Sequence, residues 1–190
     1  AKRFIVVESR LEEFETRKTE LISVLIAGDP LLPETQVGPL ARADLRDELH
    51  GQVQASLDAG ARLLLGGKSI PGPGYFYEPT IISDVRAGMS LYREETFGPV
   101  STIIPVKDTD EAIKVANDSE FGLGASLWTN DLTRGERLAR QIESGAVFIN
   151  GMTVSDPRLP FGGIKRSGYG RELSHFGIRE FTNIKSIWIA

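Results

Sequence analysis

Residues 100–117 read VSTIIPVKDTDEAIKVAN, an apolar strand-like run at 100–106 that leads into a helix-like run at 109–117. Two more strand-like runs, ASLWT at 125–129 and GAVFIN at 145–150, flank the helical pattern LTRGERLARQIES at 132–144. Strands that alternate with helices across short links form right-handed crossovers and pair in parallel. This stretch therefore predicts an α/β fold built on a parallel sheet.

The first part of the chain predicts a strand and two helices. RFIVVE at 3–8 is apolar and β-branched, which is typical of a buried strand. Ser9 and Glu12 have the spacing of a capping box, so we expect them to open a helix, which Gly28 and the residues after it should stop. A second helix is predicted from apolar residues that recur every four positions: Leu45, Leu49, Val53 and Leu57.

The remaining segments predict further strands and a long loop. ARLLLGG at 61–67 and GPGYFYEPTII at 72–82 favour antiparallel strands. Residues 150–170 are rich in glycine and lack periodicity, so we expect a loop at the carboxyl end of a parallel strand, where α/β proteins place their sites. Residues 171–176 are expected to form a short helix and residues 181–189 a closing strand.

The composition of the 190 residues excludes several classes of function. A formal net charge of −4 argues against nucleic acid or an anionic membrane as partner. No apolar run approaches the roughly 18–20 residues of a membrane helix, and no signal peptide is visible, so a cytoplasmic location is expected. Cysteine is absent and there are two histidines, so these residues offer no thiolate nucleophile and predict no metal site.

The segment EETFGPV at 94–100 contains the first candidate site. Neighbouring side chains on a strand or turn point apart, so Glu94 and Glu95 do not favour an acid/base pair that shares one proton. A single carboxylate can accept two hydrogen bonds from the vicinal hydroxyls of a ribose, while the Phe97 ring packs on a planar base. By itself the segment leaves open both a nucleotide site and ordinary solvated charge.

Taken together, several long segments resemble the carboxyl-terminal part of the catalytic domain of aldehyde dehydrogenases. In chain order they are GYFYEPTIISDV, EETFGPV, NDSEFGLGASLWTND, GAVFIN, PFGGIKRSGYGREL and FTNIKSIWI. The resemblance covers essentially the whole chain. INGMTVSD and GRELSHFGIREFTNIKSIW are most similar to the bacterial succinate-semialdehyde dehydrogenases.

The resemblance implies an enzyme that oxidises an aldehyde, such as succinate semialdehyde, to the carboxylic acid with NAD or NADP, through a cysteine thioester. In this family the nucleophilic cysteine lies just upstream of a segment like AKRFIVVES. We therefore expect a fragment whose nucleophile, general base and amino-terminal cofactor domain all lie upstream of Ala1. No catalytic residue is expected in the chain itself, which should be inactive alone.

The resemblance also assigns roles to particular residues. Glu95 matches the family residue that holds the nicotinamide ribose diol, and Phe97 matches the one that packs near the nicotinamide. Phe161 matches an aromatic residue of the substrate tunnel. A substrate with a distant carboxylate needs a cation and a hydroxyl donor, for which Ser155 and Arg158 are the local candidates. A solvent-facing Arg158 remains the alternative.

The last residues resemble the family's oligomerisation strand. We therefore expect residues 1–180 to belong to the catalytic domain and residues 181–190 to add a strand to a neighbouring subunit of a homo-oligomer, a dimer or a tetramer. Two alternatives stay open. One is the same family with another aldehyde, and the other is a non-catalytic oligomerisation or regulatory module. The choice between NAD and NADP depends on residues of the missing cofactor domain.

Overall fold

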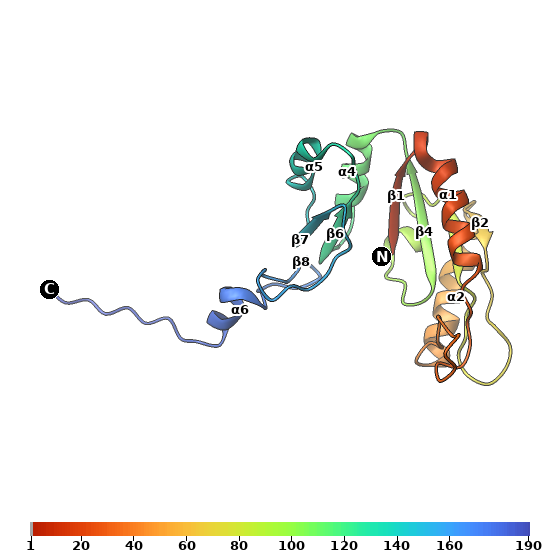
Figure 1. The fold of residues 1–190 in the computed structure, drawn as a ribbon, viewed down its shortest axis with the longest axis horizontal. Helices are drawn as coiled ribbons and strands as arrows, with labels where there is room; N and C mark the ends of the chain where they lie inside the picture. Colours follow the sequence, from red (N-terminus) through yellow and green to blue (C-terminus); the bar gives the residue numbers. More distant parts are fainter. Residues whose placement is uncertain (1) are drawn as a thin grey trace. The chain divides into compact units, whose positions relative to one another are not determined.

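A computed structural model describes residues 2–190. The chain divides into two compact units, with the boundary between Ala112 and Ile113. In Figure 1 the first unit runs from red to green and the second from green to blue.

The first unit is built on a four-stranded sheet in the order β1-β4-β3-β2. β4 pairs in parallel with β1 on one edge and with β3 on the other, whereas β2 and β3 are antiparallel. The strands are β1 (Arg3–Val7), β2 (Arg62–Leu65), β3 (Thr80–Ser83) and β4 (Val100–Val106). The parallel pairing confirms the predicted α/β class, and the pair β2–β3 confirms the antiparallel strands predicted from residues 61–67 and 72–82.

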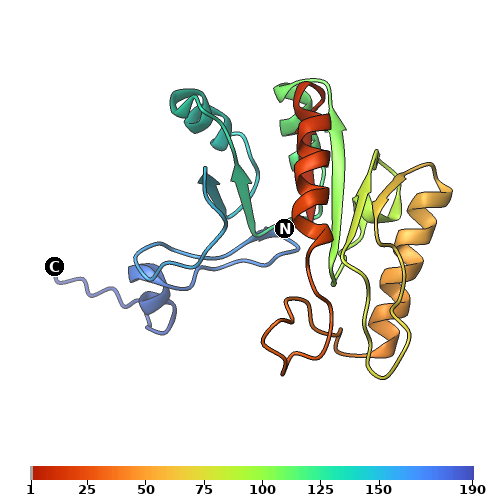
Figure 2. The same ribbon diagram turned by 45° about the vertical axis from the view of Figure 1, so that its right-hand side comes forward.

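Helices cover both faces of this sheet. α1 (Glu8–Ser23) lies on one side and α2 (Ala43–Asp58) on the other (Figure 2). Side chains alternate along each strand, so Ile81 and Ile103 join the core on the α1 side, where Phe14 packs. α3 (Ser90–Arg93) is a single turn that contacts α2 just before the EETFGPV segment.

The capping box predicted for the first helix is wrong. β1 passes directly into α1, so Val7 occupies the N-cap position, where no side-chain cap hydrogen bond is made. Ser9 therefore already lies inside the first turn. The helix also ends at Ser23, before the predicted stop at Gly28, because Ile26 accepts hydrogen bonds from the backbone of residues 36 and 37 instead of continuing the helix.

The second unit contains two small sheets. β6 (Gly124–Leu127) pairs in parallel with β7 (Ala146–Ile149), and β5 (Phe121–Gly122) pairs antiparallel with β8 (Ile164–Lys165). The helices are α4 (Thr109–Asn117), which crosses the boundary between the units, α5 (Leu132–Ala139) and α6 (Ser174–Glu180).

The structure corrects three expectations for this part of the chain. The strands predicted at 100–106, 125–129 and 145–150 do not share one sheet, because both edges of β4 are already occupied by β1 and β3. α5 ends at Ala139, short of the predicted end at residue 144. The last helix begins at Ser174 because Glu172 instead forms an antiparallel bridge with Phe161.

The final residues are extended and exposed. Residues 183–190 form neither helix nor strand within the described chain, so the closing strand expected at 181–189 is not formed by the single chain. Its apolar side chains face solvent, with Ile184 97% and Trp188 90% exposed.

Candidate cofactor and substrate segments

The segment that links α3 to β4 presents two of the predicted site residues to solvent. Glu95 is exposed, and the Phe97 side chain is 69% exposed. Thr96, between them, points inward, because its hydroxyl oxygen is buried and has no hydrogen-bond partner among residues 2–190. A carboxylate and an aromatic ring two residues apart thus lie on the outer side of one short segment, an arrangement that suits a ribose diol and a planar ring.

The buried side of this segment is held by α2. The amide Nε2 of Gln52 donates to Oε2 of Glu94 at 3.0 Å and to the carbonyl oxygen of Glu95 at 3.2 Å. Gly98 packs so closely on α2 that a Cβ atom there would lie 2.4 Å from Cδ2 of Leu49. The segment therefore has a fixed backbone beneath its exposed side chains.

A cation also lies near the two carboxylates. Burial lowers the pKa of the Lys2 amine, and the charge of Arg3 lowers it further. The carboxylates of Glu95 and Glu94 partly offset this by raising the pKa. The Glu94 carboxylate is thus engaged by Gln52, while the cation acts on the carboxylates of both Glu95 and Glu94. Glu95 uses only its backbone carbonyl for the contact with Gln52, so its carboxylate remains exposed on the outer side.

The loop after β7 carries the predicted substrate residues. Ser155 is exposed, and the Arg158 side chain is 87% exposed. Arg158 binds the carboxylate of Asp156 through Nε at 2.9 Å and through Nη2 at 2.6 Å. The hydrogen bonds from Arg158 hold the pKa of Asp156 at about 2, so the pair remains ionised at neutral pH. The Nη1 edge of Arg158 is the part left to meet a further acceptor.

Phe161 is fixed by the backbone. Its N–H and carbonyl form a reciprocal pair with those of Glu172, at 2.8 Å each. Arg171 ties the same region together by donating from Nη1 to the carbonyl oxygens of Gly163 and Gly170. Gly145 touches this loop closely, because a Cβ atom on it would lie 1.7 Å from the carbonyl oxygen of Gly162.

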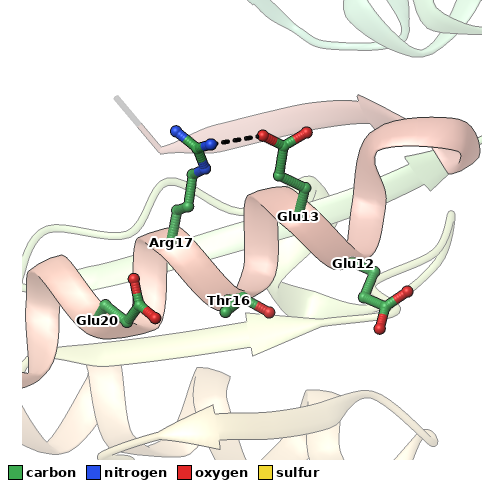
Figure 3. Close-up of a pocket in the computed structure, with 5 residues that line it drawn as sticks. All are labelled: Glu12, Glu13, Thr16, Arg17 and Glu20. Carbon is green, nitrogen blue, oxygen red and sulfur yellow. Dashed lines mark ion pairs between the residues drawn. The ribbon is translucent and has the colours of Figure 1, made fainter.

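Neither of two shallow depressions in the surface is lined by the predicted site residues. One is lined by residues of α1 alone, namely Glu12, Glu13, Thr16, Arg17 and Glu20 (Figure 3). All of them are exposed, and Arg17 pairs with Glu13 at 2.9 Å, so this is the outer face of a solvated helix. A second depression, on α6, includes Pro157 from the loop and Ile178 and Phe181.

The predicted residues thus fall into two groups. Glu95 and Phe97 share one segment of the first unit, and Ser155, Arg158 and Phe161 share one loop of the second. Sequence reasoning missed Gln52 and Asp156. A signal for Gln52 exists, because it lies three residues after Leu49 and therefore on the apolar side of α2, where a polar residue needs a partner.

The chain belongs to the aldehyde dehydrogenase family, whose family model matches residues 1–187. It is 53% identical over 189 residues to the succinate-semialdehyde dehydrogenase [NADP(+)] 1 of Mycobacterium ulcerans, covering 100% of this chain and 41% of that protein. It is 50% identical over 188 residues to the succinate semialdehyde dehydrogenase [NAD(P)+] Sad of Escherichia coli, covering 99% of this chain and 41% of that protein.

Solved structures agree with this assignment. The succinic semialdehyde dehydrogenase of Streptococcus pyogenes, crystallised in complex with NADP+, superposes with a TM-score of 0.94 at 42% identity, over 98% of this chain and 41% of that one. The chain therefore spans about two fifths of the length of its relatives. Among residues 2–190, no helix has the length and hydropathy needed to cross a membrane.

Proposed function

We propose that this chain is the carboxyl-terminal part of the catalytic domain of an aldehyde dehydrogenase that oxidises succinate semialdehyde to the acid with NAD+ or NADP+. The observation that carries the proposal is the EETFGPV segment, where Glu95 and Phe97 face outward from a backbone fixed by α2. The relatives named for this reaction, at 50–53% identity, support the choice of substrate.

In this proposal Glu95 and Phe97 hold the nicotinamide end of the cofactor. The Glu95 carboxylate accepts hydrogen bonds from the two ribose hydroxyls, and the Phe97 ring packs beside the nicotinamide. When bound, the nicotinamide supplies the acceptor for the hydride that the aldehyde carbon loses. The contribution of this chain is orientation, and small displacements of the reacting atoms are costly to the rate.

The loop at 150–170 provides the proposed substrate contacts. Ser155 and the Nη1 edge of Arg158 bind the distant carboxylate of the substrate, and Phe161 lines the passage for its carbon chain. Asp156 keeps the Arg158 side chain in one orientation by binding Nε and Nη2. Arg158 and Asp156 together carry little net charge. The arrangement of the guanidinium N–H donors, more than electrostatic attraction, therefore selects a carboxylate.

The nucleophile of the proposed thioester mechanism is a cysteine, and the chain contains none. The relatives extend well beyond the length matched here, so we assign the cysteine, the general base and the adenine-binding residues to the remaining part of a full-length protein. A cytoplasmic location belongs to the same proposal.

We also assign residues 1–180 to the catalytic domain and residues 181–190 to subunit contacts. Phe181 to Ile189 has five apolar residues that are more than three quarters exposed: Phe181, Ile184, Ile187, Trp188 and Ile189. An extended exposed segment of this kind can add as a strand to a sheet of a second copy.

The full-length protein that contains this segment tests the proposal. Purified enzyme should reduce NAD+ or NADP+ when given succinate semialdehyde, with a higher kcat/KM than for butanal, and it should release succinate. Measurement of product by mass spectrometry alongside reduced cofactor by absorbance distinguishes oxidation from other reactions. If the enzyme oxidises butanal and succinate semialdehyde equally well, the assigned substrate is wrong.

A further inference from the structure

Gln52 is a buried polar residue in the middle of α2. Its side chain is 6% exposed, and its neighbours on the same face of the helix, Leu49 and Val53, are buried and apolar. An amide removed from water destabilises the fold unless its donors and acceptor are bonded. The acceptors of the two hydrogen bonds that Gln52 donates therefore indicate the role of the residue.

Both bonds from Gln52 reach the EETFGPV segment, and they fix consecutive residues in different ways. One goes to the carboxylate of Glu94 at 3.0 Å and holds its side chain. The other goes to the carbonyl of Glu95 at 3.2 Å and holds the main chain. The first bond has an ionised acceptor and is therefore stronger than a neutral hydrogen bond. Because the Glu95 carbonyl is held, the carboxylate of Glu95 starts from a defined backbone position.

The contacts on either side of Gln52 come from the same face of α2. One turn further along the helix, the buried hydroxyl of Ser56 accepts a hydrogen bond from the N–H of Leu91 at 3.0 Å. One turn earlier, Leu49 packs against Gly98. Residues 49, 52 and 56 lie on one side of a helix. Through them α2 contacts α3 at Leu91 and the EETFGPV segment at residues 94, 95 and 98, with Gln52 at the centre of this row.

We propose that Gln52 is a positioning residue for the cofactor, acting through Glu94 and the Glu95 backbone to place the Glu95 carboxylate and the Phe97 ring. This inference rests on the proposed function. A segment held in its binding conformation loses less conformational entropy when the ligand binds, and so binds more tightly. Gln52 itself touches only the buried side of the segment and is therefore not a catalytic residue.

The test uses the full-length enzyme and equilibrium binding. Gln52→Met keeps the length of the side chain and removes both donors, and Gln54→Met is the matched control, since Gln54 is exposed on the same helix. Two ligands are titrated into each variant: the intact cofactor that the wild type binds more tightly, and its adenine half alone (adenosine 2′,5′-bisphosphate for NADP+ or AMP for NAD+).

We expect Gln52→Met to raise the Kd of the intact cofactor about tenfold, as for the loss of one hydrogen bond to a charged group. The Kd of the adenine half should stay within twofold of the wild type, because that half does not reach Glu95. General damage to the fold would weaken both ligands. An intact-cofactor Kd that matches the Gln54→Met control, or an equal loss for both ligands, overturns the inference.

A charge exchange provides a second comparison, which also decides the matter if Gln52→Met does not fold. Gln52→Glu sets a carboxylate against that of Glu94, and adding Glu94→Gln restores one amide–carboxylate hydrogen bond with the donor on the other side. The double variant should bind the cofactor at least threefold more tightly than Gln52→Glu, and equal affinities contradict the inference. Wild-type enzyme that binds no cofactor contradicts the proposed function itself, whereas tight wild-type binding with no effect of these variants contradicts only the role of Gln52.

Discussion

The side chain of Asn150 pairs with both backbone polar groups of Thr129. Its Nδ2 donates to the Thr129 carbonyl and its Oδ1 accepts from the Thr129 N–H, each at 2.8 Å. Asn150 directly follows β7, and Thr129 lies just beyond β6, so this pair joins the ends of two parallel strands where the substrate loop begins. Asn150 also has a φ of +54°, which asparagine adopts more readily than most residues.

Two substitutions of Asn150 should separate these effects. Asn150→Gly removes both side-chain hydrogen bonds but tolerates the positive φ, and should lower the free energy of unfolding by about 1–2 kcal/mol. Asn150→Ala also loses both hydrogen bonds but keeps a Cβ in the left-handed region, without the short polar side chain that lets asparagine adopt it, and should cost roughly 1 kcal/mol more than Asn150→Gly. Denaturant unfolding of the full-length enzyme gives both values. If the two variants are equally stable, the positive φ of residue 150 does not contribute to the free energy of unfolding.

A methyl group at Gly98 should disturb cofactor binding from the buried side. The new Cβ would lie 2.4 Å from Leu49, whose side chain is 1% exposed and has little room to move. We expect Gly98→Ala to raise the Kd of the cofactor about tenfold, in line with the 1–3 kcal/mol of overpacking. Adding Leu49→Val, which shortens the opposing side chain, should recover part of the loss. A double variant that binds no better than Gly98→Ala would contradict the steric explanation.

Removal of the Arg158 guanidinium should change substrate preference. Arg158→Ala is expected to lower the ratio of kcat/KM for succinate semialdehyde to that for butanal at least tenfold, about the effect of one charge-assisted hydrogen bond. Arg140→Ala is the matched control, because Arg140 is also an exposed arginine paired with a carboxylate, that of Glu136. An unaltered ratio in Arg158→Ala would remove this residue from the substrate site.

Tyr77 should make stability depend on pH under alkaline conditions. Burial raises the pKa of its phenol to about 12, and its oxygen lies 3.1 Å from Nδ1 of His50. The neutral phenol therefore stabilises the fold fully below the ordinary pKa near 10, and this contribution is lost as pH rises from there towards 12.

The measurement compares the Tm of the wild type with that of Tyr77→Phe. At pH 8 the variant should melt at a lower temperature, because the hydrogen bond to His50 is lost. The difference should shrink above pH 10, since only the wild type then loses a proton on unfolding. Tyr75→Phe serves as the control, because Tyr75 is 40% exposed. A difference that stays constant with pH would argue against the raised pKa.

Gly145 should tolerate no side chain. A Cβ there would lie 1.7 Å from the backbone carbonyl oxygen of Gly162, so the backbone would have to move to make room. We expect Gly145→Ala to cost more than about 4 kcal/mol, among the largest effects of a single substitution. At Gly151 the nearest atom is 4.0 Å away, so Gly151→Ala should melt close to the wild type. A soluble Gly145→Ala enzyme with an unaltered Tm would contradict the contact.

The parts of the fold that follow from local patterns were predictable from sequence. The four-residue spacing of Leu45, Leu49, Val53 and Leu57 matches α2, and the run at 100–106 matches β4 residue for residue. A local signal fails where the adjoining element overrides it. Ser9 and Glu12 have the right spacing for a cap, but β1 leads straight into the helix and leaves no turn for it.

Pairing and site support depend on contacts between residues far apart in the chain. Nothing near residue 100 shows that β1 and β3 occupy both edges of β4, and the bond between Gln52 and Glu94 joins residues 42 positions apart. The positions of Glu95 and Phe97 could be assigned from resemblance. The contacts that hold their backbone could not be predicted, because these contacts come from α2, which lies far away in the sequence.

The side-chain amide of Gln52 also provides an NMR signal that is specific to the contact between α2 and the EETFGPV segment. Its two hydrogens point at different acceptors, a carboxylate and a peptide carbonyl, so they should give two well-separated proton resonances on one nitrogen. Because the group is shielded from water, these protons should exchange slowly enough to follow during a titration. The NH2 group of Gln52 thus reports whether the backbone at Glu95 moves when ligands bind or dissociate. No added label near the cofactor is needed.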